Sequence, residues 1–315
     1  MRFPLGKLVT SVASGAALVG GLHLANRLVL LDDLPPTLPG AMHDWTWRGW
    51  RVRYTTLGQG RPIVLVHGVH AAASSFEMRN IFEPLAQQHA AFAVDLLGFG
   101  KSERPDAPYS GALYAELVAD FLRERIERPA VLVGSSLSAT YVVAAARSHP
   151  DLVDRVILFS PTSVTSTGAG GQAFARLLSV PVLGQAAFNL LVSHASIQSY
   201  LRRAYADATL VDDTLVGQNW ATAHQPDARL APAAFVAGHL DLPFDTNRTP
   251  IAAPILVLRG DTPGIGAQAS DAELRALGPR VTIETVGGTG QLPHDEAPDR
   301  VLGMLTTWLA ESHEK

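Results

Sequence analysis

Short apolar runs alternate with helix-like segments along most of this chain, and this alternation predicts its architecture. A Trp-rich stretch of alternating hydropathy turns at Gly58-Gln59-Gly60 and predicts a hairpin that leads into the first buried strand. Buried strands are predicted at Ile63–Val66, Ala91–Val94, Ala130–Val133, Val156–Phe159, Ile255–Leu258 and Val281–Val286. Helices are predicted at Glu77–Gln88, Ala112–Ile126, Ala139–His149, Ser270–Leu277 and Pro298–Glu311. Buried strands that alternate with helices form a mostly parallel sheet covered on both faces, so the predicted fold class is α/β.

One long interval interrupts the pattern of strands. From Val164 to Asp245 the chain contains helix-like segments with aromatic and apolar residues and no strand pattern. An insertion of this size between two strands predicts a separate helical layer, a lid over the carboxyl ends of the strands, where ligands bind in such sheets. The predicted organisation has three parts. An N-terminal segment with a linker spans residues 1–40, the core spans residues 41–163 and 246–315, and the lid spans residues 164–245.

The N-terminal segment carries a basic flank and an apolar stretch. Arg2 and Lys7 precede the run LVTSVASGAALVGGLHLA, and a Pro-rich linker follows. An apolar stretch of roughly 18 residues is typical of a secretory signal or a short signal-anchor, and an amphipathic helix on the domain or on a membrane surface fits equally well. We expect a membrane-associated or cytoplasmic protein, and the sequence leaves secretion open.

Composition excludes several functions. The chain has 315 residues, of which 47% are hydrophobic, so it can bury a large core. Its net charge of −4 and the lack of a basic run argue against a nucleic-acid partner. It has no cysteine, which excludes a thiol nucleophile, and its histidines are not spaced as metal ligands beside carboxylates. We therefore predict no metal and no cofactor; the sequence does not indicate the oligomeric state.

A serine-rich turn is the first candidate for chemistry. The string Gly134-Ser135-Ser136-Leu137-Ser138 lies between a predicted strand and an Ala-rich helix. A nucleophile on a sharp strand-to-helix turn needs small residues two positions before and after it, and Gly134 and Ser138 meet this need. The same string would also suit a serine-rich turn that only caps a helix.

Two further motifs give this turn a context. The strings IVLVHGV, with His67-Gly68, and VDLLGFGKSERP, with Asp95, Gly98, Gly100, Ser102 and Pro105, stand in order before it. With these motifs the chain resembles the α/β-hydrolase superfamily, in its serine esterase and lipase branch, over residues 45–311. The resemblance implies Ser136 as the nucleophile, and the backbone N–H groups of Val69 and Leu137 as donors to an oxyanion. A serine here also sets the chain apart from dehalogenases and epoxide hydrolases, which use a carboxylate.

The sequence departs from the superfamily at the acid and at the base. The string Gly260-Asp261-Thr262-Pro263 has proline at the position of the expected acid, and Asp261 stands two residues earlier. In the string GTGQLPHDEAP, Gln291 replaces the expected histidine, and His294 follows three residues later. Glutamine cannot accept a proton from a serine. Either His294 reaches Ser136 with Asp261 behind it, or the triad is lost and His294 only begins a helix.

Three functions remain open at this point. We expect a serine hydrolase that acts on a carboxylic ester or another small apolar acyl compound through a Ser136 acyl-enzyme, with His294 and Asp261 completing an altered triad. The alternatives are a catalytically silent protein that binds an apolar ligand or partner under the lid, and a cofactor-free lyase or isomerase. His67 is expected to brace the oxyanion turn, and other histidines are substitute bases only if the fold brings them to Ser136: His70, His224 and His239.

Overall fold

One mixed sheet organises the protein. The computed structural model describes residues 20–31, 34, 37–162, 164, 168–245, 249–262, 264–265 and 267–311. The sheet has eight strands in the order β1-β2-β4-β3-β5-β6-β7-β8. The strands are β1 Ala41–Trp47, β2 Trp50–Leu57, β3 Arg61–Val66, β4 His89–Val94, β5 Ala130–Ser135, β6 Val153–Phe159, β7 Ile255–Gly260 and β8 Val281–Val286. Strands β3 to β8 run parallel, while β2 pairs antiparallel with β1 and β4, so the predicted mostly parallel α/β sheet is confirmed.

The hairpin turns earlier than the sequence indicated. Strands β1 and β2 meet at Arg48 and Gly49, both with positive φ. The predicted turn at Gly58–Gly60 instead connects β2 to β3, which are not neighbours in the sheet. The predicted position of the hairpin turn was therefore wrong. The two-residue turn at Arg48 requires a left-handed backbone, and arginine is not a residue that is typical of such turns.

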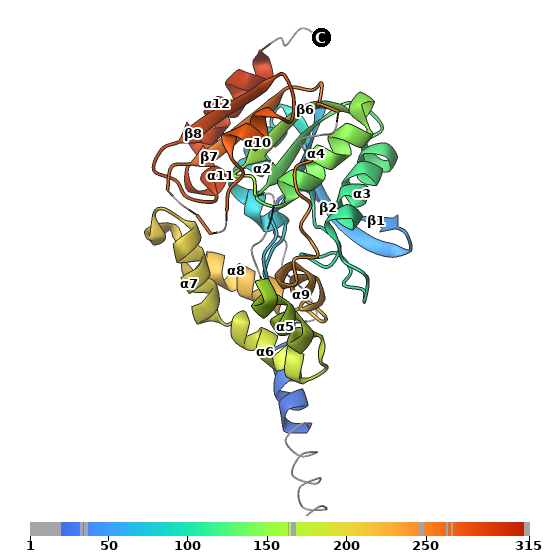
Figure 1. Cartoon of the computed structure of the whole chain (residues 1–315), viewed down its shortest axis with the longest axis vertical. Coiled ribbons are helices and arrows are strands. Elements are labelled where there is room, and N and C mark those ends of the chain that lie inside the picture. Colours follow the sequence, from blue (N-terminus) through green and yellow to red (C-terminus); the bar gives the residue numbers. More distant parts are fainter. Residues whose placement is uncertain are drawn as a thin grey trace, which may run out of the picture.

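Helices cover both faces of the sheet (Figure 1). On one face α3 Gly111–Phe121, α4 Ser138–Ser148 and α10 Asp271–Arg275 pack on alternate strand residues such as Val64 and Val66. On the other face α2 Arg79–Ala86 and α12 Pro298–Ala310 pack on Ile63 and Leu65. Two predicted helices are subdivided: the short 3-10 turn Ser75–Met78 precedes α2, and a π-helical turn Leu122–Ile126 ends α3.

The chain forms a helical layer after β6 and before β7. The layer consists of α5 Gly168–Ser179, α6 Leu183–Leu191, α7 His194–Ala204, α8 Asp213–Ala223 and α9 Leu230–Val236, with a short 3-10 turn at Ala208–Leu210. These helices share an apolar core of their own that includes Phe188, Leu201 and Leu215. Figure 1 shows the layer at the end of the molecule opposite α12.

Only part of the N-terminal segment falls within the described residues. Residues 20–28 form a helix, whereas most of the predicted apolar stretch lies outside the described part of the chain. None of the described helices combines the length and the hydropathy needed to cross a membrane.

Candidate active site

Ser136 stands on a strained turn at the carboxyl end of β5. Its φ of 51° lies in the left-handed region, which costs energy for a residue with a side chain. The turn is held because the Ser136 N–H donates to Phe159 O at 2.9 Å and the Ser136 carbonyl accepts from Thr162 N at 3.1 Å. A side chain at Gly134 would come within 2.9 Å of the Ala139 Cα atom, which explains the small residue there.

Two backbone donors flank the serine. Within the described part of the chain, the N–H groups of Val69 and Leu137 have no hydrogen-bond acceptor. Leu137 follows Ser136 directly and precedes the first residue of α4, where the helix dipole favours negative charge. Val69 follows Gly68, and a Cβ atom placed on Gly68 would lie 3.4 Å from the Cβ of Ser136. Both donors therefore belong to the surroundings of the serine.

Gln291 is the side chain that faces Ser136. Its Nε2 atom lies 3.5 Å from Ser136 Oγ and 3.3 Å from the carbonyl oxygen of Ser160. A carbonyl oxygen only accepts hydrogen bonds, so the nitrogen of the amide must point this way. The loop is anchored to the helical layer, since the Gln291 N–H donates to Ala204 O at 2.7 Å. The group beside Ser136 is thus a donor and not a base.

His294 lies elsewhere. It belongs to the short helix α11 Pro293–Glu296, is fully buried, and stacks on Phe159 with 4.4 Å between ring centroids. Its Nε2 atom lies 3.3 Å from Glu77 Oε1. Among the described residues no hydrogen bond links either ring nitrogen of His294 to Ser136. The structure therefore does not bring together the expected pair of Ser136 and His294.

Glu77 is a buried carboxylate that the sequence did not point out. Its Oε2 atom accepts the N–H of Gly68 at 2.8 Å, while Oε1 pairs with His294. Burial alone would raise the pKa of Glu77, but the interaction with His294, aided by Ser135 and His67, lowers this pKa to about 2. Glu77 is therefore ionised and ties the turn that carries Val69 to α11.

Asp261 does not stand behind His294 either. It is exposed, and its Oδ1 atom accepts the N–H of Gly288 at 2.8 Å. This hydrogen bond to the Gly288 backbone lowers the pKa of Asp261. Asp261 thus braces the loop before Gln291, and the predicted chain from Ser136 through His294 to Asp261 is absent from this structure. Pro263 lies outside the described residues.

The other histidines have structural partners. His67 Nε2 accepts from Leu96 N at 3.1 Å and Nδ1 donates to Gly68 O at 2.6 Å, so this ring braces the turn. His224 stacks on Trp220, and His239 is exposed. No hydrogen bond within the described residues joins any of them to Ser136, and His, Asp and Glu side chains there do not gather in threes as a metal site requires.

His70 lines an apolar cavity under the helical layer. The cavity measures about 570 Å³ and is lined mainly by apolar side chains of α6, α7 and α9, with Tyr200 and Asn219. The His70 ring stacks on Tyr200, and its Nδ1 accepts the Ala72 N–H at 3.3 Å, which leaves Nε2–H as a donor. Burial lowers the pKa of His70 to about 4, so the ring is neutral at pH 7.

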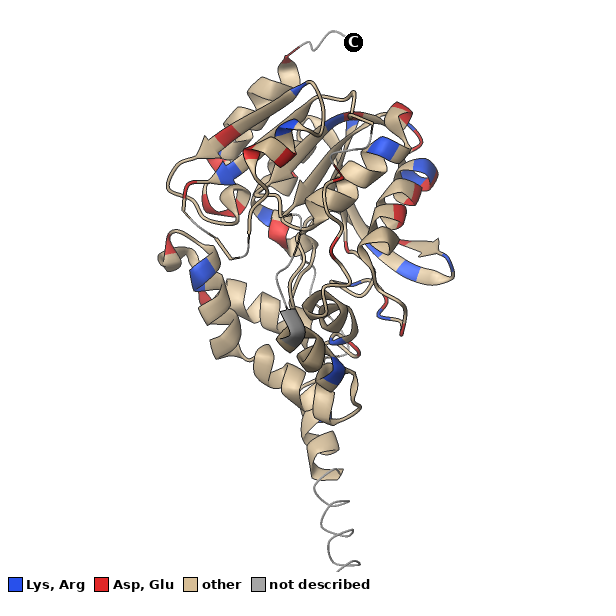
Figure 2. Ribbon diagram, in the orientation of Figure 1, with Lys and Arg blue, Asp and Glu red and all other residues tan. Residues whose placement is uncertain are grey.

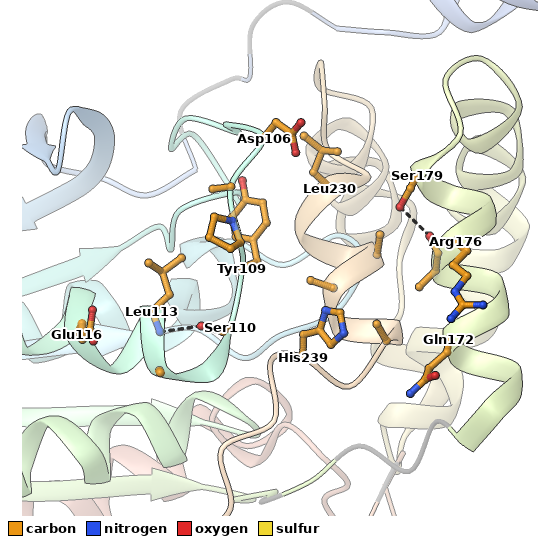
Figure 3. A pocket seen from close by; sticks show the side chains of 17 residues that line it. Asp106, Tyr109, Ser110, Leu113, Glu116, Gln172, Arg176, Ser179, Leu230 and His239 are labelled. Carbon is orange, nitrogen blue, oxygen red and sulfur yellow. Dashed lines mark hydrogen bonds between the residues drawn. The ribbon is translucent and has the colours of Figure 1, made fainter.

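A larger hollow lies apart from the serine. It measures about 960 Å³ and opens between Tyr109, Leu230 and Arg176. Figure 3 shows His239 and Leu230 on one side, and Gln172, Arg176 and Ser179 along α5 on the other. Neither Ser136 nor Gln291 lines it.

Comparisons with known proteins identify the family of this chain. Residues 63–303 match the family model described as the alpha/beta hydrolase family. The 2-(acetamidomethylene)succinate hydrolase of Mesorhizobium japonicum is 27% identical over 80% of this chain and 89% of its own. The 2-hydroxymuconate semialdehyde hydrolase of Pseudomonas putida is 26% identical over 84% of this chain and 92% of its own.

Solved structures support the fold. An esterase from Thermogutta terrifontis aligns with a TM-score of 0.68 at 20% identity, covering 87% of this chain and 100% of its own. The epoxide hydrolase CorEH aligns with a TM-score of 0.72 at 19% identity, covering 86% and 98%. The named relatives are hydrolases of small molecules.

Proposed function

This chain belongs to the α/β hydrolase family, and on that premise we propose that it is a serine hydrolase of small carboxylic esters or related acyl compounds. Ser136 is the proposed nucleophile, and the N–H groups of Val69 and Leu137 are the proposed oxyanion donors. The observation that carries this proposal is the strained turn at Ser136, since a left-handed serine between two N–H groups without acceptors has no evident structural benefit.

The proposed chemistry has one unusual step. Ser136 Oγ adds to the acyl carbon, the carbonyl oxygen becomes negative between the two N–H groups, and the alcohol leaves as the acyl-enzyme forms. With Gln291 beside the hydroxyl, the proton of Ser136 passes to water and not to imidazole, and the departing alkoxide takes a proton from water. A water molecule then adds to the acyl carbon of the acyl-enzyme, which releases the carboxylic acid and restores the Ser136 hydroxyl. A well-placed base contributes about 10²–10⁴-fold to such a step. We therefore expect slow acylation, favouring esters whose leaving group departs readily.

The cavity under the helical layer suits the apolar part of the substrate. Its walls are mainly aliphatic, and His70 Nε2–H, Asn219 and Arg203 offer polar contacts. Ser136 does not line the cavity itself, but His70 does, and His70 directly follows Val69 in the chain. We propose that the layer acts as a lid and that the substrate is a small, largely apolar acyl compound with one oxygen acceptor. The relatives' names indicate small-molecule substrates, which supports this class.

A second candidate function rests on the amide itself. Because Gln291 donates towards Ser136 Oγ, the site also suits a protein that binds an apolar ligand without turning it over. The two functions differ in whether Ser136 reacts covalently.

Labelling with a fluorophosphonate separates them. We expect slow, stoichiometric modification that peptide mass spectrometry maps to Ser136, absent in Ser136→Ala and unchanged in Ser148→Ala, an exposed serine at the end of α4. Failure to label Ser136, under conditions that saturate a reference serine esterase, would reject the hydrolase and favour the binding protein.

A further inference from the structure

Exposed apolar side chains gather at one end of the molecule. Of the ten large hydrophobic residues that are exposed in the described part of the chain, seven lie on the N-terminal helix or around α5 and α6. Leu28 is 77% exposed, Leu190 76% and Leu24 60%. We call the seven the leucine face: Leu24, Leu28, Leu177, Val180, Leu183, Leu190 and Leu191. Such a gathering is unusual on a monomer in water and marks an interaction site.

The N-terminal helix and α6 form one surface. Asn26 Nδ2 donates to Val182 O at 2.9 Å, and Asn189 Nδ2 donates to Asn26 Oδ1 at 3.1 Å. The chain after the helix is also attached, because the Leu31 N–H donates to His224 O at 2.7 Å. Figure 1 shows this helix extending from the α6 end, away from the sheet.

The helices that carry this face contain no acidic residue. The sequence has no Asp or Glu between Asp154 and Asp207 and none before Asp32, so the α5–α7 segment and the N-terminal helix are free of acidic residues. Arg27 and Arg176 are the charged residues of the N-terminal helix, α5 and α6. Figure 2 shows few coloured residues along α5 and α6, in contrast to the mixed charges on the sheet domain.

We propose that the leucine face docks on an anionic lipid bilayer. An apolar surface with cationic side chains and no carboxylates is attracted by anionic headgroups and buries its leucines among the acyl chains. A second copy of this chain is a poorer occupant, because a symmetric contact would oppose arginines to arginines. The apolar run from Leu8 leads into the helix on this face, so the sequence before it favours the same partner.

The docked orientation has a consequence for the site. Leu191 belongs to the leucine face and also lines the cavity beneath the helical layer. The cavity would then open next to the bilayer, from which an apolar compound can enter. This consequence rests on the proposed function, whereas the docking itself does not.

Vesicle flotation of the full chain tests the docking. The probes are vesicles of phosphatidylcholine alone and of phosphatidylcholine with phosphatidylglycerol at three to one. The test variant is Leu183→Glu with Leu190→Glu, and the control is Leu210→Glu, which changes a leucine that is 44% exposed outside the face. We expect the wild-type chain and the control to float with the anionic vesicles, and the double variant to float about tenfold less.

Three outcomes would overturn the proposal. One is a wild-type chain that stays in solution with both kinds of vesicle. Another is a double variant that floats like the wild type while its thermal unfolding shows that it is folded. The last is a wild-type dimer in light scattering that the double variant converts to a monomer, which would make the face a contact between copies. None of these outcomes depends on the reactivity of Ser136, so the proposed function is tested separately.

Discussion

Gln291 presents its amide nitrogen to the hydroxyl of Ser136 across 3.5 Å, at the position where a hydrolase of this family would hold its base. The same nitrogen lies 3.3 Å from Ser160 O, which fixes the orientation of the amide. The serine is therefore held on a nucleophile turn, while the amide beside it can donate a hydrogen bond but cannot accept the proton of the hydroxyl. This relationship determines how the site should respond to substitution.

Replacing His294 should leave the reactivity of Ser136 nearly unchanged. His294→Gln keeps a donor for Glu77 and removes the imidazole, so the rate of fluorophosphonate labelling should change by less than about threefold. Loss of a true general base would lower the rate by about 10²-fold or more. Asp261→Asn, at the exposed loop, is the companion variant and should behave alike. A large loss of the labelling rate in either variant would show that the replaced residue takes part in the reaction.

Glu77 should make the fold sensitive to acid. Its pKa is lowered from the ordinary 4.5 to about 2, so its contribution to the free energy of unfolding is complete above pH 4.5 and is lost as the pH falls towards 2. Glu77→Gln can still accept the Gly68 N–H but carries no charge. In urea titrations, the stability difference between wild type and Glu77→Gln should shrink as the pH is lowered from 6 to 3.

The control for this titration lies on the next helix. Glu83→Gln removes an exposed carboxylate of α2 and should show a smaller change over the same pH range. A stability difference for Glu77→Gln that stays constant with pH would contradict the lowered pKa of the Glu77 carboxyl.

The nucleophile turn should tolerate no side chain at Gly134. In Gly134→Ala the new Cβ would lie 2.9 Å from Ala139 Cα and 3.0 Å from Val142 Cγ2. We expect the free energy of unfolding to fall by about 1–3 kcal/mol. Gly217→Ala, on the open side of α8, should instead raise it by up to about 1 kcal/mol. Equal stability of the two variants in denaturant titrations would contradict the close packing of this turn.

The sheet was predictable because its strands are dense aliphatic runs. Ile63–Val66 is buried on both faces, so this segment is a continuous apolar run without polar alternation. Such a run is typical of a strand inside a parallel sheet. The hairpin turn at Arg48 was not predictable in the same way, since its left-handed backbone follows from the strand register and not from a typical turn residue.

The parts of the site that depend on neighbours close in sequence were predictable. Ser136 follows from small neighbours within two positions, and Gln291 follows from a short motif. The pairing of His294 with Glu77 was not foreseeable, because the two residues are far apart in the sequence and meet only when α11 packs near the turn before α2. Asp261 suited the role of an acid by position, but its partner is the backbone of Gly288.

The most direct measurement compares Gln291→His with Gln291→Met in fluorophosphonate labelling of Ser136. We expect the imidazole to raise the second-order labelling rate about tenfold or more, whereas methionine, which removes the amide without adding a base, should not raise it. Adding Pro263→Asp, at the position that the resemblance gives to the acid, should raise the rate of Gln291→His further. If Gln291→His and Gln291→Met both label more slowly than the wild type, then Gln291 itself activates Ser136, and the claim that this serine lacks a base at its side is contradicted.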